Sequence, residues 1–334
     1  MIPCYTQFST SQDAHLLASK YYMDGKYIIV GNVNGVITMY TARNLKIKAT
    51  FLDEEIQKCG ISVSSVIPFN KSLYCSYVNG IVKEWDIETK TCVHTFRTEP
   101  RSANSMAVDQ NGKFVLTFNY DNKIRQYDFL KGKYIKSFTD RILSKKRCGH
   151  QRKICAIKFN PVIENEFISG GWDSMVHFWD LRMSNSFDYF DGAYICAEDG
   201  LDISADSRWV MAANFQKRKT AVIRTYQSPH ERTLVIDVGQ KLYCGKFLGR
   251  NHVALGGTMP CRLFVLNLLT KEMLMRLILP HDGIYAMDFY NIDPSLGSES
   301  IHAKIAVIHG RTLTEVTFLY KPKMSISDFD LFLR

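Results

Sequence analysis

The amino-acid sequence predicts an all-β fold: a seven-bladed β-propeller of four-stranded antiparallel blades, with an N-terminal strand closing the last blade. Two observations lead to this prediction. Short alternating strands recur with a period of roughly 40–50 residues, which is the range of four-stranded propeller blades. One spacing of a turn residue and an aromatic residue also recurs within them. The 334 residues, 46% of them hydrophobic, can fill the core of one large all-β domain.

The clearest unit is the segment EFISGGWDSMVHFWD, residues 166–180. Its apolar start is typical of a strand, Asp173 and Ser174 form a turn, and MVHFWD is an aromatic-rich strand that alternates its facing. The segments on either side supply one further strand each. The unit therefore has four strands joined by turns.

Copies of this unit are found along the whole chain. In four of them a turn-forming Asn or Asp lies six residues before an aromatic residue. The pairs are Asn34 with Tyr40, Asn79 with Trp85, Asp121 with Tyr127, and Asp173 with Trp179. Three later segments fit more loosely, namely residues 207–226, 251–268 and 302–320. Together they make seven units.

The two ends of the chain complete this scheme. The last unit, from about residue 284 to residue 320, supplies only three strands, and an open edge strand invites aggregation. The N-terminal IPCYTQFS is strand-like and belongs to no unit. We therefore predict one propeller over residues 1–320, with residues 1–10 closing its last blade. The remaining residues, 321–334, form a C-terminal tail that either covers an apolar rim or docks on another protein.

Four residues of the fourth unit carry a resemblance to a known family: His150 in a Gly-His pair, Ser169, Asp173 and Trp179. With them the chain resembles the WD-repeat family of β-propellers. The resemblance implies that the four side chains form a hydrogen-bonded tetrad within one blade, where a buried imidazole and carboxylate need partners. It also implies a role as a subunit or adaptor in a larger assembly.

The same residues contain the side-chain types of a hydrolase triad, but the sequence favours the structural tetrad. A catalytic serine sits on an exposed turn, whereas Ser169 lies in a predicted strand. Cys148, His150 and Cys155 lack the paired spacings of a zinc site, and no phosphate-binding loop is present. No carboxylate cluster is recognised on the innermost strands. We therefore expect no enzymatic activity, no metal, no cofactor and no small-molecule substrate.

Positive charge is unevenly distributed along the chain. The net charge is +9, and two predicted loops, RILSKKRCGHQRK and QKRK, together carry nine basic residues. In a propeller the loop leading into a blade and the loop between its second and third strands lie on the same face. We therefore expect a basic face that attracts acidic peptides, phosphorylated partners or nucleic acid. The alternative is a pair of solvated loops that only aids solubility.

Two aromatic residues, Trp172 and Tyr120, directly precede the Asp of such a loop, a position that commonly faces the binding surface in WD-repeat proteins. Each is a candidate interface anchor; the alternative is packing on the neighbouring loop. The predicted partner-binding residues are Trp172, Tyr120, Lys145, Lys146, Arg147, Arg152, Lys153, Lys217, Arg218 and Lys219. The leading hypothesis is a non-catalytic interaction scaffold in a multi-subunit assembly. The second is a nucleic-acid-associated role for the same loops.

Cysteine use and hydropathy address location. The nine cysteines are scattered and odd in number, which favours free thiols in a reducing compartment over a disulfide framework. No apolar run reaches the length of about 18 residues expected of a membrane-spanning helix, and the N-terminus does not resemble a signal peptide. We expect an intracellular protein, cytoplasmic or nuclear, that does not insert into membranes.

Overall fold

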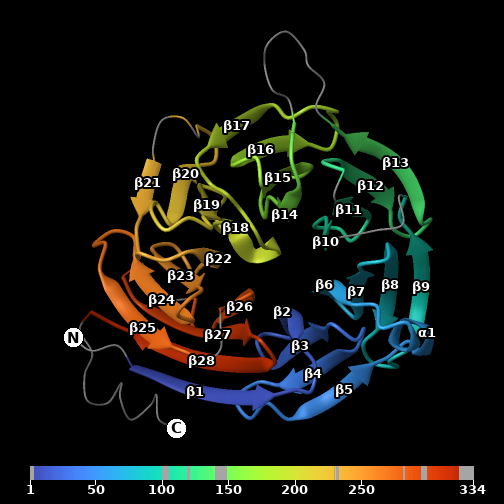
Figure 1. Ribbon diagram of the computed structural model, residues 1–334, viewed down its shortest axis with the longest axis horizontal. Coiled ribbons are helices and arrows are strands. Elements are labelled where there is room, and N and C mark those ends of the chain that lie inside the picture. Colours follow the sequence, from blue (N-terminus) through green and yellow to red (C-terminus); the bar gives the residue numbers. More distant parts are fainter. Residues whose placement is uncertain are drawn as a thin grey trace.

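Seven four-stranded antiparallel sheets form a ring in the computed structural model (Figure 1), and we call the centre of this ring the channel. This arrangement confirms the predicted propeller. The structure describes residues 4–99, 105–118, 121–139, 149–228, 230, 233–280, 283–294 and 299–322. In this part of the chain no helix combines the length and the apolar character needed to cross a membrane.

The first four blades follow one another along the chain, each running from the channel outwards. Blade 1 contains β2 (Leu16–Tyr22), β3 (Tyr27–Asn32), β4 (Ile37–Thr41) and β5 (Ile47–Phe51). Blade 2 contains β6 (Val63–Phe69), β7 (Ser72–Tyr77), β8 (Ile81–Asp86) and β9 (Cys92–Arg97). Blade 3 contains β10 (Ser105–Val108), β11 (Phe114–Phe118), β12 (Ile124–Asp128) and β13 (Lys133–Phe138). Blade 4 contains β14 (Ile154–Phe159), β15 (Glu166–Gly171), β16 (Met175–Asp180) and β17 (Asp188–Asp191).

The remaining blades complete the ring. Blade 5 contains β18 (Leu201–Ile203), β19 (Trp209–Ala213), β20 (Ala221–Thr225) and β21 (Thr233–Ile236). Blade 6 contains β22 (Leu242–Phe247), β23 (His252–Gly257), β24 (Arg262–Asn267) and β25 (Met273–Ile278). Blade 7 contains β26 (Ala286–Asn291), β27 (Ile301–His309), β28 (Thr312–Tyr320) and β1 (Cys4–Ser11). Two short helices lie in loops, α1 (Glu54–Lys58) and the 3-10 turn η1 (Glu198–Gly200).

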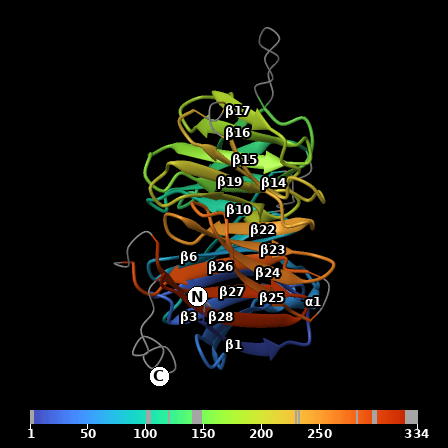
Figure 2. The same cartoon turned by 90° about the vertical axis from the view of Figure 1, so that its left-hand side faces the viewer.

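The N-terminal strand closes the ring, as the sequence predicts. Strand β1 pairs antiparallel with β28 over its whole length, from Cys4 opposite Leu319 to Ser11 opposite Thr312. Figures 1 and 2 both show β1 lying along the outer side of blade 7. The last blade thereby gains a fourth strand from the other end of the chain, and the edge of β28 is covered.

The recurrent aromatic residues hold neighbouring blades together. Trp85 packs edge-on against Phe51 of the preceding blade, with ring centroids 6.1 Å apart. Trp179 packs in the same way against Phe138, at 5.8 Å. Both tryptophans lie on the third strand of their blade, and both phenylalanines lie on the outermost strand of the blade before. The repeated spacing in the sequence therefore reflects one inter-blade contact.

A repeated backbone hydrogen bond defines one face of the ring. A residue one or two positions after the second strand donates its backbone N–H to a carbonyl in the loop leading into the same blade. This bond joins Val33 to His15, Val78 to Ser62, Trp172 to Lys153, Phe215 to Tyr194 and Thr258 to Lys241. The N–O distances are 2.8–3.1 Å. The two kinds of loop are therefore neighbours, and we call the face on which they lie the upper face.

Candidate functional site

The four predicted tetrad residues form one chain of hydrogen bonds in blade 4. Trp179 Nε1 donates to Ser169 Oγ at 2.7 Å, and Ser169 Oγ lies 2.7 Å from His150 Nε2. His150 Nδ1 lies 2.8 Å from Asp173 Oδ2 and donates to it, since a carboxylate only accepts. Ser169 lies on a buried strand and not on an exposed turn, so this arrangement lacks the access that a nucleophile needs.

The carboxylate of Asp173 ties the upper loops of blade 4 together. It accepts backbone N–H groups from Gln151 and Met175 as well as the bond from His150. Burial alone would raise the pKa of Asp173, but the hydrogen bond and charge of His150, together with these N–H groups, hold it below its usual value. The carboxylate is therefore ionised at neutral pH and fixes the loops on either side of Trp172.

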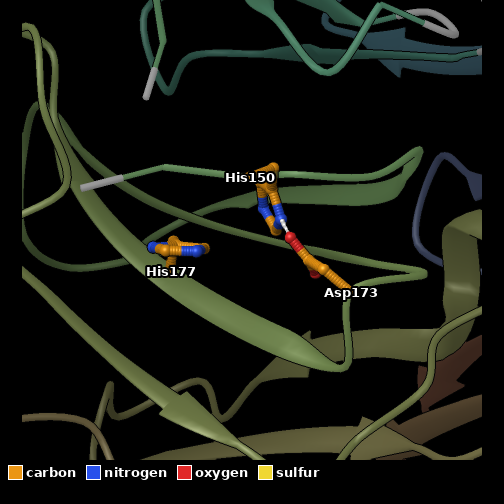
Figure 3. Close-up of side chains that lie close together, drawn as sticks. All are labelled: His150, Asp173 and His177. Carbon is orange, nitrogen blue, oxygen red and sulfur yellow. Dashed lines mark hydrogen bonds and ion pairs between the residues drawn. The ribbon is translucent and has the colours of Figure 1, made fainter. Parts of the chain in front are cut away.

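A second histidine lies against the tetrad. Figure 3 shows His177 beside His150 and Asp173, and the two imidazole centroids are 4.5 Å apart. Ligand atoms of these three residues lie within 4.8 Å of one another, so they are the described group that could approach one metal ion. Both ring nitrogens of His150 already have partners, however. The sequence predicts no zinc site at Cys148, His150 and Cys155. Of these three residues, Cys148 lies outside the described part of the chain.

Trp172 lies on the upper face and is 41% exposed. Its ring stacks on Tyr194, with centroids 6.1 Å apart and planes inclined by 20°. The ammonium group of Lys153 lies 5.1 Å from the centre of the indole ring. Trp172 is held there because its backbone N–H donates a hydrogen bond to the backbone carbonyl of Lys153. The structure thus brings together two predicted partner-binding residues, Trp172 and Lys153, and adds Tyr194.

The same contact recurs one blade further on. Phe215 occupies in blade 5 the position of Trp172, and the ammonium group of Lys241 lies 4.6 Å from its ring centre. Phe215 also packs against Tyr243 at 4.7 Å, and Tyr243 packs against Tyr285 at 5.1 Å. Aromatic rings interleaved with lysines thus follow the upper face from blade 4 to blade 7. We call this row the aromatic arc; its members are Trp172, Tyr194, Phe215, Tyr243 and Tyr285.

The sequence interpretation missed every member of the arc except Trp172. Phe215 lies two residues after a second strand and Trp172 one residue after. Tyr243 and Tyr285 lie at the start of, or directly before, innermost strands, whereas Tyr194 lies in the longer loop between β17 and β18. Aligning the seven units on these two positions is the signal that could have found them.

The remaining predicted basic residues divide into two groups. Arg152, Lys217, Arg218 and Lys219 are exposed, and the last three lie in the upper loop that follows Phe215. The structure therefore places one basic loop beside the aromatic arc. The other predicted residues, Tyr120, Lys145, Lys146 and Arg147, lie outside the described part of the chain.

Carboxylates do converge on the innermost strands, contrary to the expectation from the sequence. Asp199, in η1, reaches into the channel. Its Oδ1 lies 3.1 Å from Lys20, 3.4 Å from Lys158 and 2.9 Å from Lys246. Asp202 and Asp288 lie close enough to Lys246 for their charges to act on it. On the innermost strands of blades 4, 5, 6, 7 and 1 there is a single charged residue each, and its sign alternates: Lys158, Asp202, Lys246, Asp288 and Lys20. We call these residues and Asp199 the channel cluster.

Every carboxylate of the channel cluster has a structural partner. Asp202 accepts the N–H of Phe247 in the next blade at 2.9 Å, and Asp288 accepts that of Tyr21 at 2.8 Å. Burial would raise the pKa of Asp199, yet the three lysines hold it far below its usual value. The cluster joins five blades through ion pairs and backbone hydrogen bonds.

The channel is open above this cluster. A cavity of about 250 Å³ lies at its upper end, between the innermost strands and η1. Its described charged lining residues are Lys20, Lys153, Glu198 and Asp199. Tyr285, the last ring of the aromatic arc, also lines it. The cavity and the arc are therefore parts of one continuous surface.

Comparison with known proteins agrees with this geometry. The family model described as "WD domain, G-beta repeat" matches residues 90–128 and 142–180. The protein named "Restriction of telomere capping protein 1" of Saccharomyces cerevisiae (strain ATCC 204508 / S288c) is 34% identical over 108 residues, or 32% of this chain and 8% of that protein. The "Probable di- and tripeptidase DUG2" of the same strain is 24% identical over 144 residues, or 40% of this chain and 14% of that protein.

These likenesses concern small parts of the two relatives. The matched segments span 8% and 14% of their lengths, so their printed activities say little about this chain. In particular, a partial match to a peptidase assigns no catalytic residue here. WD domains are in general non-catalytic scaffolds for protein interaction, which suits a rigid ring with an exposed loop face.

Proposed function

We propose that this chain, whose residues 90–128 and 142–180 match the WD-repeat family model, is a non-catalytic interaction scaffold whose upper face binds an acidic or phosphorylated partner. The observation that carries this proposal is the aromatic arc with its lysines. Lys153 lies over Trp172 and Lys241 lies over Phe215. Aromatic side chains and cations thus lie together on the upper face of the propeller.

Exposed cations gather in this region, beside the exposed carboxylate of Asp237, which accepts the backbone N–H of Lys219 at 3.4 Å. Arg152, Lys217, Arg218 and Lys219 are exposed around the arc. The nearest described carboxylate of blade 4, Asp173, is occupied by His150 and two backbone N–H groups. A field of unbalanced positive charge steers negatively charged partners to the surface. Charge-assisted hydrogen bonds to carboxylate or phosphate oxygens then hold them there.

Trp172 is the proposed anchor of the interface. Its exposed ring is pinned by the backbone bond to Lys153 and by the stack on Tyr194. An aromatic side chain that is already ordered loses little conformational entropy on binding, so more of its contact energy contributes to affinity. The tetrad beneath it serves the same end, since it fixes the loop that carries Trp172.

The proposal extends to the setting of the protein. We propose that it works as one subunit of an assembly in the cytoplasm or nucleus. The seven cysteines whose side chains the structure describes are all free thiols, which suits a reducing compartment. Fractionation of cells that express a tagged chain tests this location.

The test is charge reversal of one loop, Lys217→Glu, Arg218→Glu and Lys219→Glu together. A matched control reverses three exposed lysines that lie in or directly after turns on the opposite face, Lys46, Lys131 and Lys133. Affinity purification with mass spectrometry then compares the partners of both variants with those of the unchanged chain. Loss of partners only from the first variant supports the proposal. An unchanged set would mean that the loop is merely solvated surface.

A nucleic-acid-associated role is the second candidate. Rings interleaved with cations can stack on bases while lysines contact phosphates, and one relative is named for telomere capping. Binding of a single-stranded oligonucleotide that falls steeply between 50 and 200 mM salt, as expected from counterion release, would favour this role. Weak salt dependence together with retention of a protein partner would favour the scaffold.

A further inference from the structure

We propose that the cavity at the upper end of the channel receives one uncharged apolar side chain from an acidic linear segment of the partner. This inference rests on the proposed function and specifies its ligand. The ligand would be an extended peptide with Asp or Glu residues flanking a single Leu, Ile, Met or Phe. Three features of the surface lead to it: an apolar wall, a basic wall and a floor whose charges are already balanced.

The apolar wall is formed by blades 1, 2 and 4. Val63, Val66 and Ile154 line the cavity and are buried. At its rim Leu17 and Val78 are 37% and 46% exposed. Exposed apolar side chains that continue into a cavity are typical of a docking site for a hydrophobic group. A volume of about 250 Å³ suits one anchoring residue and not a folded element.

The basic wall adjoins the apolar wall at blade 4, where Lys153 directly precedes Ile154. Lys153 and Tyr285 line the cavity, and from there the aromatic arc leads outwards to the exposed loop that holds Lys217, Arg218 and Lys219. A segment whose apolar residue enters the cavity therefore runs over this wall. Acidic residues on that segment find cations, so charge complementarity selects an acidic flank.

The charges at the floor of the cavity favour an uncharged anchor. The described charged residues of the cavity are two lysines, Lys20 and Lys153, and two acids, Glu198 and Asp199. Asp199 is paired with Lys20 at 3.1 Å, and Glu198 accepts a hydrogen bond from Ser65 at 3.1 Å while its charge is countered by the nearby Lys20 and Lys158. A further charged side chain would enter a site of balanced charge and lose its hydration without gaining a counter-ion, which is costly.

One buried hydroxyl at the wall has no partner of its own. Ser105 is 2% exposed and lines the cavity, and its Oγ makes no hydrogen bond within the described residues. A backbone N–H or carbonyl of an inserted peptide could satisfy it. This observation favours a peptide over a purely hydrocarbon ligand.

The test uses the whole chain and a phage-displayed library of random dodecapeptides. Enriched peptides should carry one Leu, Ile, Met or Phe beside at least two acidic residues. Synthetic fluorescein-labelled copies are then titrated by fluorescence polarisation. Changing both Leu17 and Val78 to Gln should weaken binding at least about tenfold, because the anchor loses its apolar rim. The matched control changes Ile47 and Val93, exposed residues of outer strands, to Gln and should leave the affinity unchanged.

The outcomes separate the inference from the proposed function. Peptides that bind through the Lys217–Lys219 loop but ignore Leu17 and Val78 would overturn the inference and leave the scaffold proposal standing. Enrichment of Arg or Lys anchors, or of no peptide at all, would also overturn it. Peptides that are insensitive to both the rim and the basic loop would contradict both proposals.

Discussion

The protein uses clustered charge in two ways, and the channel cluster and the upper face show the contrast. In the channel, Asp199 lies within 3.4 Å of three lysine ammonium groups, and all of these groups are largely buried. On the upper face, Lys217, Arg218 and Lys219 are exposed, and the carboxylate beside them, that of Asp237, bonds to the backbone N–H of Lys219 and is itself exposed. Similar side chains therefore serve the fold in one place and remain available to a partner in the other.

The difference teaches which charges are free to bind. A buried cation must be neutralised within the fold, since removing it from water is costly. The alternation of Lys and Asp over blades 4 to 1 achieves this, with Asp199 as the shared partner. An exposed cation keeps its hydration and loses little by remaining unpaired. The upper face can therefore carry the positive charge that the channel cannot.

The largest expected effect comes from removing the shared carboxylate. Asp199→Ala should lower the free energy of unfolding by about 3–5 kcal/mol, because it leaves three buried ammonium groups without their common partner. Chemical denaturation measures this. The matched control is Glu88→Ala, which breaks an exposed ion pair with Lys71 at 3.6 Å and should cost no more than about 0.5 kcal/mol. Equal effects of the two changes would erase the distinction between the channel and the surface.

A smaller effect is expected from the tetrad of blade 4, which is tied to the upper loops of that blade. Asp173→Ala should cost about 1–3 kcal/mol, because His150 and two backbone N–H groups lose their acceptor. It should also weaken partner binding, since the loop of Trp172 is no longer fixed. The midpoint of thermal unfolding and the partner affinity are measured together. An unaltered melting temperature would argue that the tetrad does not stabilise blade 4.

The sequence predicts the ring well because its signals are local. The Asp173–Trp179 spacing recurs in the first three units, and in blades 2 and 4 its aromatic residue packs on Phe51 or Phe138 of the preceding blade. Closure by β1 was predictable for a similar reason, since the last unit lacks one strand and the N-terminal segment has no other partner. Both inferences need only the pattern of strands and the cost of an open edge.

The channel cluster escaped prediction because its central residue belongs to no repeat. Asp199 lies in the loop between β17 and β18, and nothing in the local sequence shows that η1 enters the channel. The partners of Asp199 could have been predicted from the sequence. Once the innermost strands are aligned, Lys158, Asp202 and Lys246 stand out as single charges of alternating sign. The aromatic arc was missed similarly, because Tyr194 and Phe215 gain meaning only when successive blades are placed side by side.

Acid should lower the stability of the fold through the buried side chain of His177. Burial, with the neighbouring charge of His150, lowers the pKa of His177 from 6.5 to about 3. The unfolded chain therefore takes up this proton first, so the stability is fully present above pH 6.5 and declines as the pH falls towards 3. At pH 5.5 the loss from this residue should be about 1.4 kcal/mol.

The variant His177→Gln isolates this contribution, since a glutamine can keep the bond to Ser186 without a titratable ring. Between pH 7.5 and 5.5 the free energy of unfolding should fall in both proteins. The fall should be smaller in the variant than in the unchanged chain, and the difference between the two should be about 1.4 kcal/mol. His252→Gln serves as a comparison, because burial lowers the pKa of His252 to about 4 and its removal should act in the same direction. If His177→Gln follows the acid profile of the unchanged chain, the imidazole is not held neutral in the fold.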